Sequence, residues 1–118
     1  IDKLLKFTTM KRLICSVGGY LHDGDIVTLC GEECQIIATP GHTPGGVCLY
    51  FPNQKIVFTG DTLFAGGIGR ADLPGGNYAT LIQSIQKRLL TLPPDTKIYC
   101  GHGPASTIAE EKQMNPYL

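Results

Sequence analysis

The chain has no excess of charge of either sign: 10 lysines and arginines balance 10 aspartates and glutamates over 118 residues. Without a basic field it has no electrostatic means of gathering nucleic acid, and no polybasic patch for an anionic membrane. Long apolar runs are also lacking, since a stretch such as residues 47–51 is far shorter than the roughly 20 residues of a membrane span. We therefore expect one domain at most, with no nucleic-acid partner and no membrane partner.

A paired cysteine framework is missing as well. The five cysteines are an odd number, and Cys30 and Cys34 are the closest pair in sequence. Two thiolates at this spacing could bind zinc, but a zinc finger needs a second pair nearby. We interpret them instead as small, half-buried residues in a reducing cytosol. The chain begins at Ile1 with neither a methionine nor a signal peptide, which says little about targeting, and the composition favours a cytoplasmic protein.

Hydrophobic patterning predicts a sheet within a layered α/β protein. Residues 1–20 could form a short helix, and the apolar runs that follow predict two hairpins, with turns at 31–32 and 52–54. The predicted strands are residues 26–29, 34–38, 47–51, 56–59 and 97–100. Their runs of apolar residues are typical of strands that are covered on both faces for part of their length.

The stretch 60–77 is rich in glycine and predicts a long irregular loop, a feature that is usually functional in a compact domain. A helix should follow, with Asn77 capping its start and Pro93–Pro94 ending it. Its predicted apolar face contains Tyr78, Leu81, Ile82, Ile85, Leu89 and Leu90. Residues 107–110 have the form of a capping box and predict a short terminal helix.

Three polar side chains follow predicted strands and are embedded in glycine. His42 lies in Thr-Pro-Gly-His-Thr-Pro-Gly-Gly, Asp61 follows Phe-Thr-Gly, and His102 lies in Cys-Gly-His-Gly. Strands aim such side chains, and glycine lets the backbone turn close to a site. A lone loop histidine would favour a capping role and a lone aspartate a turn. Three units of one design, offering imidazole and carboxylate together, favour metal ligands, although three are too few for a complete metallo-hydrolase site.

Other polar residues carry weaker signals. His22 leads into a hairpin without a preceding glycine, so we interpret it as a surface turn residue. Arg70 and Asp72 could form an ion pair that ties down the glycine-rich loop, and two solvated charges are an equally good interpretation. The run 66–69 lacks the Lys-Ser/Thr of a phosphate-binding loop and does not open a helix directly.

In their order, these motifs resemble the metallo-β-lactamase superfamily, and within it the short glyoxalase II-like hydrolases related to hydroxyacylglutathione hydrolase. The resemblance covers residues 22–118 and rests on the three glycine-rich motifs, on Gly-Ile-Gly-Arg-Ala-Asp and on the terminal Asn-Pro-Tyr-Leu. The family's His-x-His-x-Asp-His motif and its helical glutathione-binding domain are not found in the chain. The resemblance therefore implies an α/β fold that is roughly the C-terminal half of an αββα sandwich. Residues 1–118 would be part of a single domain, with 1–20 a poorly matched lead-in.

The resemblance also implies a centre of two zinc ions, with iron or manganese as alternatives. His42 would bind the first metal, Asp61 would bridge both, and His102 would bind the second. The intact protein would hydrolyse a small-molecule thioester or ester by activating water. Residues 63–77 would shape one wall of the cleft, with Arg70 and Asp72 bracing the loop.

The resemblance leaves alternatives for what the chain does. The isolated chain should be inactive, and it should associate with the missing N-terminal half or with itself. A relative of the persulfide dioxygenases would instead use one iron held by two histidines and an aspartate, with His42 and Asp61 among them. A third interpretation is a noncatalytic assembly module that keeps the second half of the fold.

Overall fold

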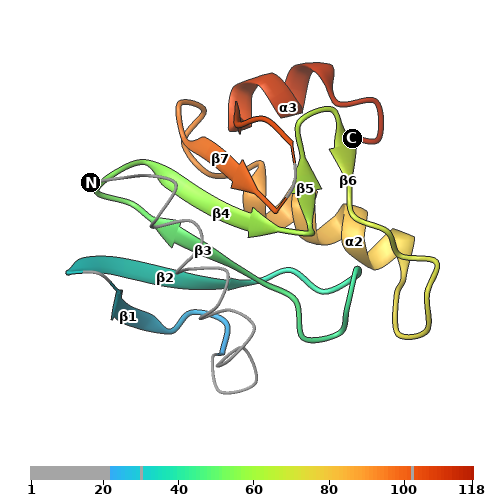
Figure 1. Ribbon diagram of the computed structural model, residues 1–118, viewed down its shortest axis with the longest axis horizontal. Coiled ribbons are helices and arrows are strands. Elements are labelled where there is room, and N and C mark those ends of the chain that lie inside the picture. Colours follow the sequence, from blue (N-terminus) through green and yellow to red (C-terminus); the bar gives the residue numbers. More distant parts are fainter. Residues whose placement is uncertain (1–21, 30, 102) are drawn as a thin grey trace.

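The computed structural model describes residues 22–29, 31–101 and 103–118. In this part of the chain one six-stranded sheet has the order β1-β2-β3-β4-β7-β8 (Figure 1). Its strands are β1 (Ile26–Leu29), β2 (Glu32–Ala38), β3 (Val47–Phe51), β4 (Ile56–Gly60), β7 (Lys97–Cys100) and β8 (Ser106–Thr107). A small second sheet pairs β5 (Leu63–Phe64) with β6 (Gly67–Ile68). The helical segments are α2 (Tyr78–Ser84), the π-helical η2 (Ile85–Leu89) and α3 (Ile108–Met114).

One pair of neighbouring strands in the sheet is parallel, and the others are antiparallel. Strands β1 to β4 pair in sequence order as antiparallel neighbours, and β4 pairs with β7 in parallel. Parallel strands end at the same edge of a sheet, and Gly60 of β4 is accordingly the partner of Cys100 of β7. The next amide continues this contact, because the N–H of Gly101 donates to the carbonyl of Gly60 at 2.7 Å. The segments that follow β4 and β7 therefore leave the sheet side by side.

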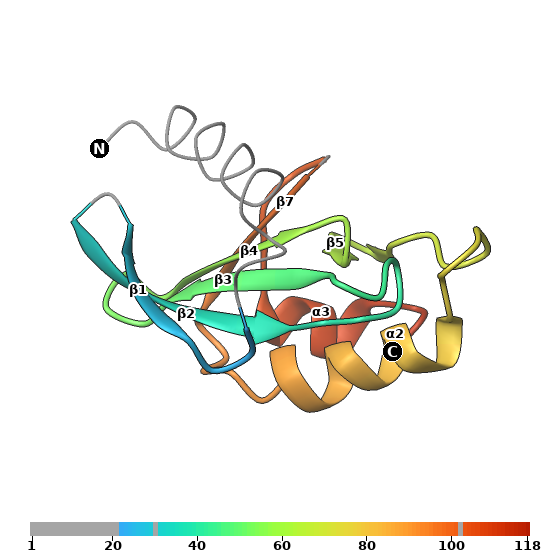
Figure 2. The ribbon, with the colours of Figure 1, turned by 90° about the horizontal axis from the view of Figure 1, so that it is seen from below.

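The sheet is apolar on both faces. Helices α2 and α3 lie on the same side of it (Figure 2), and an apolar cluster joins them to the strands. This first cluster includes Ile37, Cys48, Tyr50, Val57, Leu81, Ile85, Leu89, Ile98 and Ile108. Alternate residues of the same strands form a second cluster of Cys34, Ile36, Leu49, Phe51 and Phe58. The prediction of strands covered on both faces is confirmed, and because β2 points Cys34 into the second cluster, that side chain is fully buried rather than half-buried.

The helix predicted to start after Asn77 forms as α2 and η2. Its start and most of its buried face agree with the prediction, whereas Tyr78 does not. The N–H of Thr80 donates to the Asn77 side chain at 3.0 Å, which is the expected cap. Leu81, Ile85 and Leu89 are buried. Tyr78 is 48% exposed, against the prediction, because the first turn of α2 lies beyond the end of the sheet (Figure 2).

The prediction of an irregular loop over 60–77 is wrong at its start, where the β5–β6 hairpin forms. Leu63 is fully buried and its carbonyl accepts a hydrogen bond from the Thr59 hydroxyl at 2.7 Å. Gly66 makes the turn with a φ of 75°, a conformation that glycine adopts without steric cost. The density of glycine thus marks a tight turn here rather than a lack of structure.

The terminal helix begins as predicted, because the N–H of Glu110 donates to the Thr107 hydroxyl at 3.2 Å. In a capping box the Glu110 carboxylate would accept from the N–H of Thr107. Here the carboxylate accepts from the Ser106 hydroxyl at 3.3 Å. The helix predicted within 1–20 lies outside the described residues. In the part of the chain that the structure describes, no helix is long and apolar enough to cross a membrane.

Candidate metal centre

His42 lies in a tight loop between β2 and β3 that is closed on itself and held by α2. The N–H of Thr39 donates to the carbonyl of Gly46 at 2.9 Å and closes the loop. The N–H of Asn77 donates to the carbonyl of Gly41 at 2.8 Å. A Cβ at Gly41 would lie 2.3 Å from the Cα of Leu81, so the helix backbone touches the loop where a side chain has no room. The glycine before His42 is therefore what allows α2 to fix this loop.

The His42 ring is oriented by a backbone carbonyl. Its Nδ1 lies 2.6 Å from the carbonyl oxygen of Arg70, and a carbonyl can only accept, so we place the proton on Nδ1. The other ring nitrogen, Nε2, then presents a lone pair, and it lies 3.9 Å from Oδ2 of Asp61. Metal-binding histidines usually donate their second ring N–H to a carbonyl or carboxylate in this way. The geometry places an imidazole nitrogen beside a carboxylate oxygen, which is the arrangement that the predicted ligand roles require.

Asp61 directly follows β4, in a turn where the backbone packs very tightly. A Cβ at Gly69 would lie 1.8 Å from the carbonyl oxygen of Asp61, and one at Gly101 would lie 2.8 Å from its Oδ1. The N–H of Gly69 also donates to the carbonyl of Thr62 at 3.0 Å. Two glycines distant in sequence therefore make the space in which Asp61 meets the end of β7 and the segment that follows β6.

The structure brings together two of the three predicted ligands. His42 and Asp61 face each other, with side chains that are 29% and 47% exposed, so both can be reached from solvent. His102 lies outside the described residues, although Gly101 before it lies beside the Asp61 carboxylate. Among the described residues, no three His, Cys, Asp or Glu side chains gather into a group that could hold a metal ion. The role of His102 stays a prediction.

Of the two interpretations left open for Arg70 and Asp72, the structure shows the ion pair. The guanidinium donates from Nε to Oδ1 at 2.9 Å and from a terminal nitrogen to Oδ2 at 3.2 Å. These hydrogen bonds lower the pKa of Asp72 and raise that of Arg70 above their ordinary values. His22 is a surface turn residue as predicted, since its side chain is 81% exposed. What the sequence did not reveal is the Arg70 carbonyl, because a main-chain acceptor carries no residue-type signal.

A buried polar contact connects the loop that carries His42 to the turn that carries Asp61. The Thr39 hydroxyl lies 3.3 Å from the Thr62 hydroxyl and 3.3 Å from the Cys48 thiol. All three side chains are buried. Burial raises the pKa of the Cys48 thiol from 9.0 to about 11, because the thiolate would lose its hydration. The thiol is thus kept neutral between the loops that carry His42 and Asp61.

We expect the stability of the chain to depend on this thiol at alkaline pH. Below about pH 9 the thiol is neutral in both folded and unfolded chains, whereas between pH 9 and about 11 only the unfolded chain ionises. The free energy of unfolding should therefore fall across this interval by about 2 kcal/mol more for the wild type than for Cys48→Ala. Urea unfolding of both proteins at about pH 8 and pH 10.5 measures the difference. Equal losses in the two proteins would contradict the prediction.

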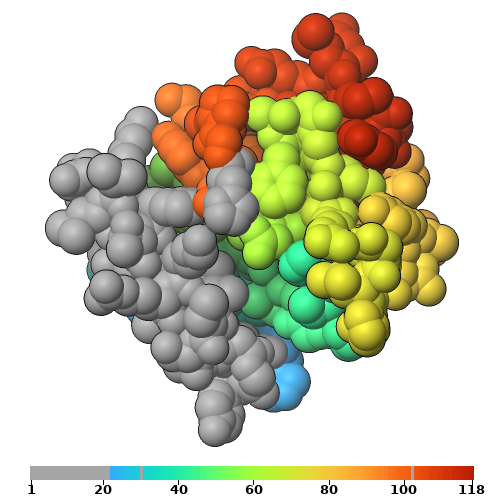
Figure 3. Space-filling model, turned by 45° about the vertical axis from the view of Figure 1, so that its right-hand side comes forward, coloured from blue at the N-terminus to red at the C-terminus, as the bar shows by residue number. Residues whose placement is uncertain are grey.

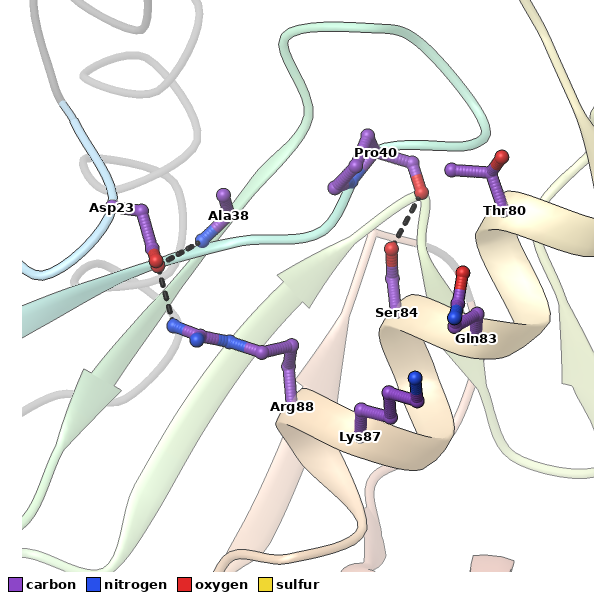
Figure 4. Close-up of a pocket in the computed structure, with 8 residues that line it drawn as sticks. All are labelled: Asp23, Ala38, Pro40, Thr80, Gln83, Ser84, Lys87 and Arg88. Atoms are coloured by element: carbon purple, nitrogen blue, oxygen red, sulfur yellow. Dashed lines mark hydrogen bonds and ion pairs between the residues drawn. The ribbon is translucent and has the colours of Figure 1, made fainter.

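A hollow of about 260 Å³ lies beside α2 and η2 (Figure 4). Arg88 and Asp23 form an ion pair of 2.5 Å across it, and the same carboxylate accepts from the N–H of Ala38 at 2.9 Å. The Ser84 hydroxyl donates to the carbonyl of Pro40 at 2.8 Å. Neither His42 nor Asp61 lines this hollow. Its contacts fasten the helix to the end of β2 and thereby support the loop that holds His42.

Comparison with known proteins gives consistent matches to one group. The family model described as Metallo-beta-lactamase superfamily matches residues 17–102. Hydroxyacylglutathione hydrolase GloC of Haemophilus influenzae is 49% identical over 96 residues, which cover 81% of the chain but 45% of that protein. The crystal structure of BLEG-1 B3 metallo-beta-lactamase matches with a TM-score of 0.78 and 39% identity, over 82% of the chain and 46% of that structure.

A third match concerns metal content. The structure of TTHA1623 in a di-iron-bound form has a TM-score of 0.75 and 45% identity, over 83% of the chain and 47% of that structure. In all three comparisons the chain spans slightly less than half the length of the protein it matches. The similarity therefore concerns one part of a longer kind of protein.

Proposed function

The chain belongs to the metallo-beta-lactamase superfamily, and from this premise we propose that it is part of a metal-dependent hydrolase of thioesters or esters. We propose His42, Asp61 and His102 as its metal ligands. The observation that carries the proposal is the His42 ring, whose Nδ1 meets the Arg70 carbonyl at 2.6 Å while Nε2 faces the Asp61 carboxylate. The similarity to a hydroxyacylglutathione hydrolase supports a thioester as the substrate class.

The donor set fits the metals that this superfamily binds. An imidazole nitrogen and a carboxylate oxygen suit zinc, iron and manganese, so the residues themselves accept any of the three. We propose a pair of zinc ions, with His42 on one metal, Asp61 shared by both and His102 on the other. When bound, the metals would supply Lewis acidity, which polarises a carbonyl and lowers the pKa of water toward neutrality.

The residues around the ligands have positioning roles. The Arg70 carbonyl keeps the proton of His42 on Nδ1, so that the ring offers Nε2 to a metal. Gly69 leaves room for the Asp61 backbone, and Gly101 leaves room for its carboxylate, so the carboxylate can keep the position from which it would bind a metal. The exposed Arg70–Asp72 pair would brace the segment whose Arg70 carbonyl meets His42.

The chain alone should be catalytically incomplete. Three predicted ligands divided between two metals leave each metal short of the usual protein donors, so affinity should be weak. We propose that an N-terminal half, or association of the chain with itself, completes the site. We also propose a cytoplasmic location, supported by Cys34 and Cys48, which are thiols rather than disulfides.

The test compares the 118-residue chain with a protein extended upstream through its own coding sequence. With zinc, the extended protein should hydrolyse a hydroxyacylglutathione thioester, whereas the isolated chain should give no turnover above a chelator-treated control. Turnover by the pure isolated chain would contradict the incompleteness. Failure of the extended protein on thioesters and esters, together with dioxygen uptake when loaded with iron, would replace the hydrolase with an iron oxygenase.

A further inference from the structure

The terminal segment contains a buried polar network that the proposed chemistry does not use. Glu111 on α3 is 4% exposed, Asn115 just after it is 5% exposed, and Ser106 on β8 is 6% exposed. Taking a carboxylate out of water is costly unless hydrogen bonds compensate it. Apolar side chains of similar size would fill such a space without that cost. The role of this network can therefore be inferred from the groups that it contacts.

Those contacts reach the turn of the β5–β6 hairpin. Oε1 of Glu111 accepts from the N–H of Gly66 at 2.8 Å and from the side-chain amide of Asn115 at 2.9 Å. The same Asn115 amide donates to the carbonyl of Gly67 at 3.1 Å. The Ser106 hydroxyl donates to the other carboxylate oxygen and completes the network. Glu111 of α3 and Asn115 just after it thus bind one backbone N–H in the hairpin turn and one carbonyl at the start of β6, 45 and 48 residues away in sequence.

The hairpin turn leads directly to the group that orients His42. From Gly67 the chain passes through β6 to Gly69, whose N–H donates to the carbonyl of Thr62 at 3.0 Å, and then to the Arg70 carbonyl. In the space-filling view the yellow-green segment around residues 61–69 lies between the red C-terminal residues and the teal segment near residue 40 (Figure 3). One short hairpin therefore spans the distance from α3 to the His42 loop.

We propose that Glu111 and Asn115 are positioning residues for the metal centre. By fixing the hairpin turn they place the Arg70 carbonyl against Nδ1 of His42, which in turn directs Nε2 toward Asp61. The purpose of this arrangement rests on the proposed function, since ring orientation matters most if His42 binds a metal. The arrangement itself is a property of the folded chain and can be tested without metal or substrate.

The test uses two disruptive variants and two controls. Glu111→Leu removes both acceptor oxygens, and Asn115→Ala removes the donor to Gly67. Glu111→Gln is the conservative variant, because its carbonyl oxygen can replace Oε1 while its amide can donate to Ser106. Ile108→Val reduces packing of the same helix, where Ile108 is 1% exposed, without touching the network. This last variant separates loss of stability from loss of positioning.

The readout is the tautomer of His42, measured by nitrogen-15 NMR of the ring in mildly alkaline buffer. Comparison with His42→Asn assigns the signal, and the exposed His22 serves as an internal reference. Glu111→Leu and Asn115→Ala should lower the Nδ1–H population at least about twofold, toward that of an unrestrained ring. Glu111→Gln and Ile108→Val should keep the wild-type tautomer.

An unchanged tautomer in folded Asn115→Ala or Glu111→Leu would overturn the proposal, even if both variants lose stability. The same holds if Ile108→Val shifts the tautomer as far as they do. If Glu111→Leu does not fold, Asn115→Ala decides the outcome alone, since it keeps the Glu111 carboxylate and removes only the side-chain amide that bonds to Gly67, Glu111 and the N–H of Tyr117. A hydrolase assay that fails leaves this result untouched, so failure of the proposed function and failure of the positioning role can be told apart.

Discussion

Gly69→Ala is expected to disrupt the candidate metal centre. A methyl group at this position would make a closer contact than one at the other glycines of the described residues. The new Cβ would lie 1.8 Å from the carbonyl oxygen of Asp61, 3.0 Å from its carbonyl carbon and 3.5 Å from the Cβ of His42. The first two atoms belong to the backbone, so no rotamer change can remove the clash. Either Asp61 or the segment after β6 must move. Overpacking in a core typically costs 1–3 kcal/mol, and we expect a loss of about 3 kcal/mol or more here.

Gly45→Ala is the matched control, because Gly45 belongs to the His42 loop and a Cβ there would meet no atom within 4 Å. Urea unfolding should show Gly45→Ala within about 1 kcal/mol of the wild type, the usual range for a surface substitution. Nitrogen-15 NMR of His42 should show an altered ring environment in Gly69→Ala alone. Equal stability of the two variants would mean that the close approach of Gly69 to Asp61 does not exist in solution.

Local patterning was enough to predict most of the sheet. The apolar runs of β1, β3 and β7 define strands because each is bounded by turn residues, and the observed bounds coincide with the predicted ones. Asn77 and Thr107 were recognisable as helix caps because a cap acts on an amide three residues away. The approach of His42 to Asp61 followed from one shared design, a ligand set in glycine after a strand. The strands and the caps are determined within a few neighbouring residues, whereas the approach of His42 to Asp61 joins two separate loops.

The features that sequence reasoning missed depend on contacts between distant segments. The β5–β6 hairpin has few residues of its own, and it is held by Glu111 from 45 residues away. The carbonyl that orients His42 comes from Arg70, 28 residues further along the chain. The side chain of Glu111 resembles that of any charged helix residue in sequence, and its burial becomes visible only when α3 meets the hairpin. Long-range main-chain acceptors leave no residue pattern to find.

His42→Ala is expected to lower the affinity of the chain for zinc by about 100-fold, because it removes the imidazole that we propose as a direct ligand. Loss of an outer hydrogen-bond partner alone costs about 10–100-fold. His22→Ala should leave the affinity for zinc unchanged, since His22 is a turn residue whose side chain is 81% exposed and which we do not propose as a ligand. Competition against a chromophoric chelator measures both constants. A ratio between variants suffices, because the wild-type affinity of an incomplete site is itself expected to be low.

Asp61→Asn separates a metal site from a mere loop contact. The amide has nearly the shape of the carboxylate and fits beside Gly101, but it is neutral and a far weaker metal ligand. Zinc should therefore raise the unfolding temperature of the wild type, because a ligand that binds only the folded chain stabilises it. It should do so for His22→Ala but not for Asp61→Asn or His42→Ala. If zinc stabilises Asp61→Asn as much as the wild type, the ion binds elsewhere, and the facing pair of His42 and Asp61 would be a structural contact alone.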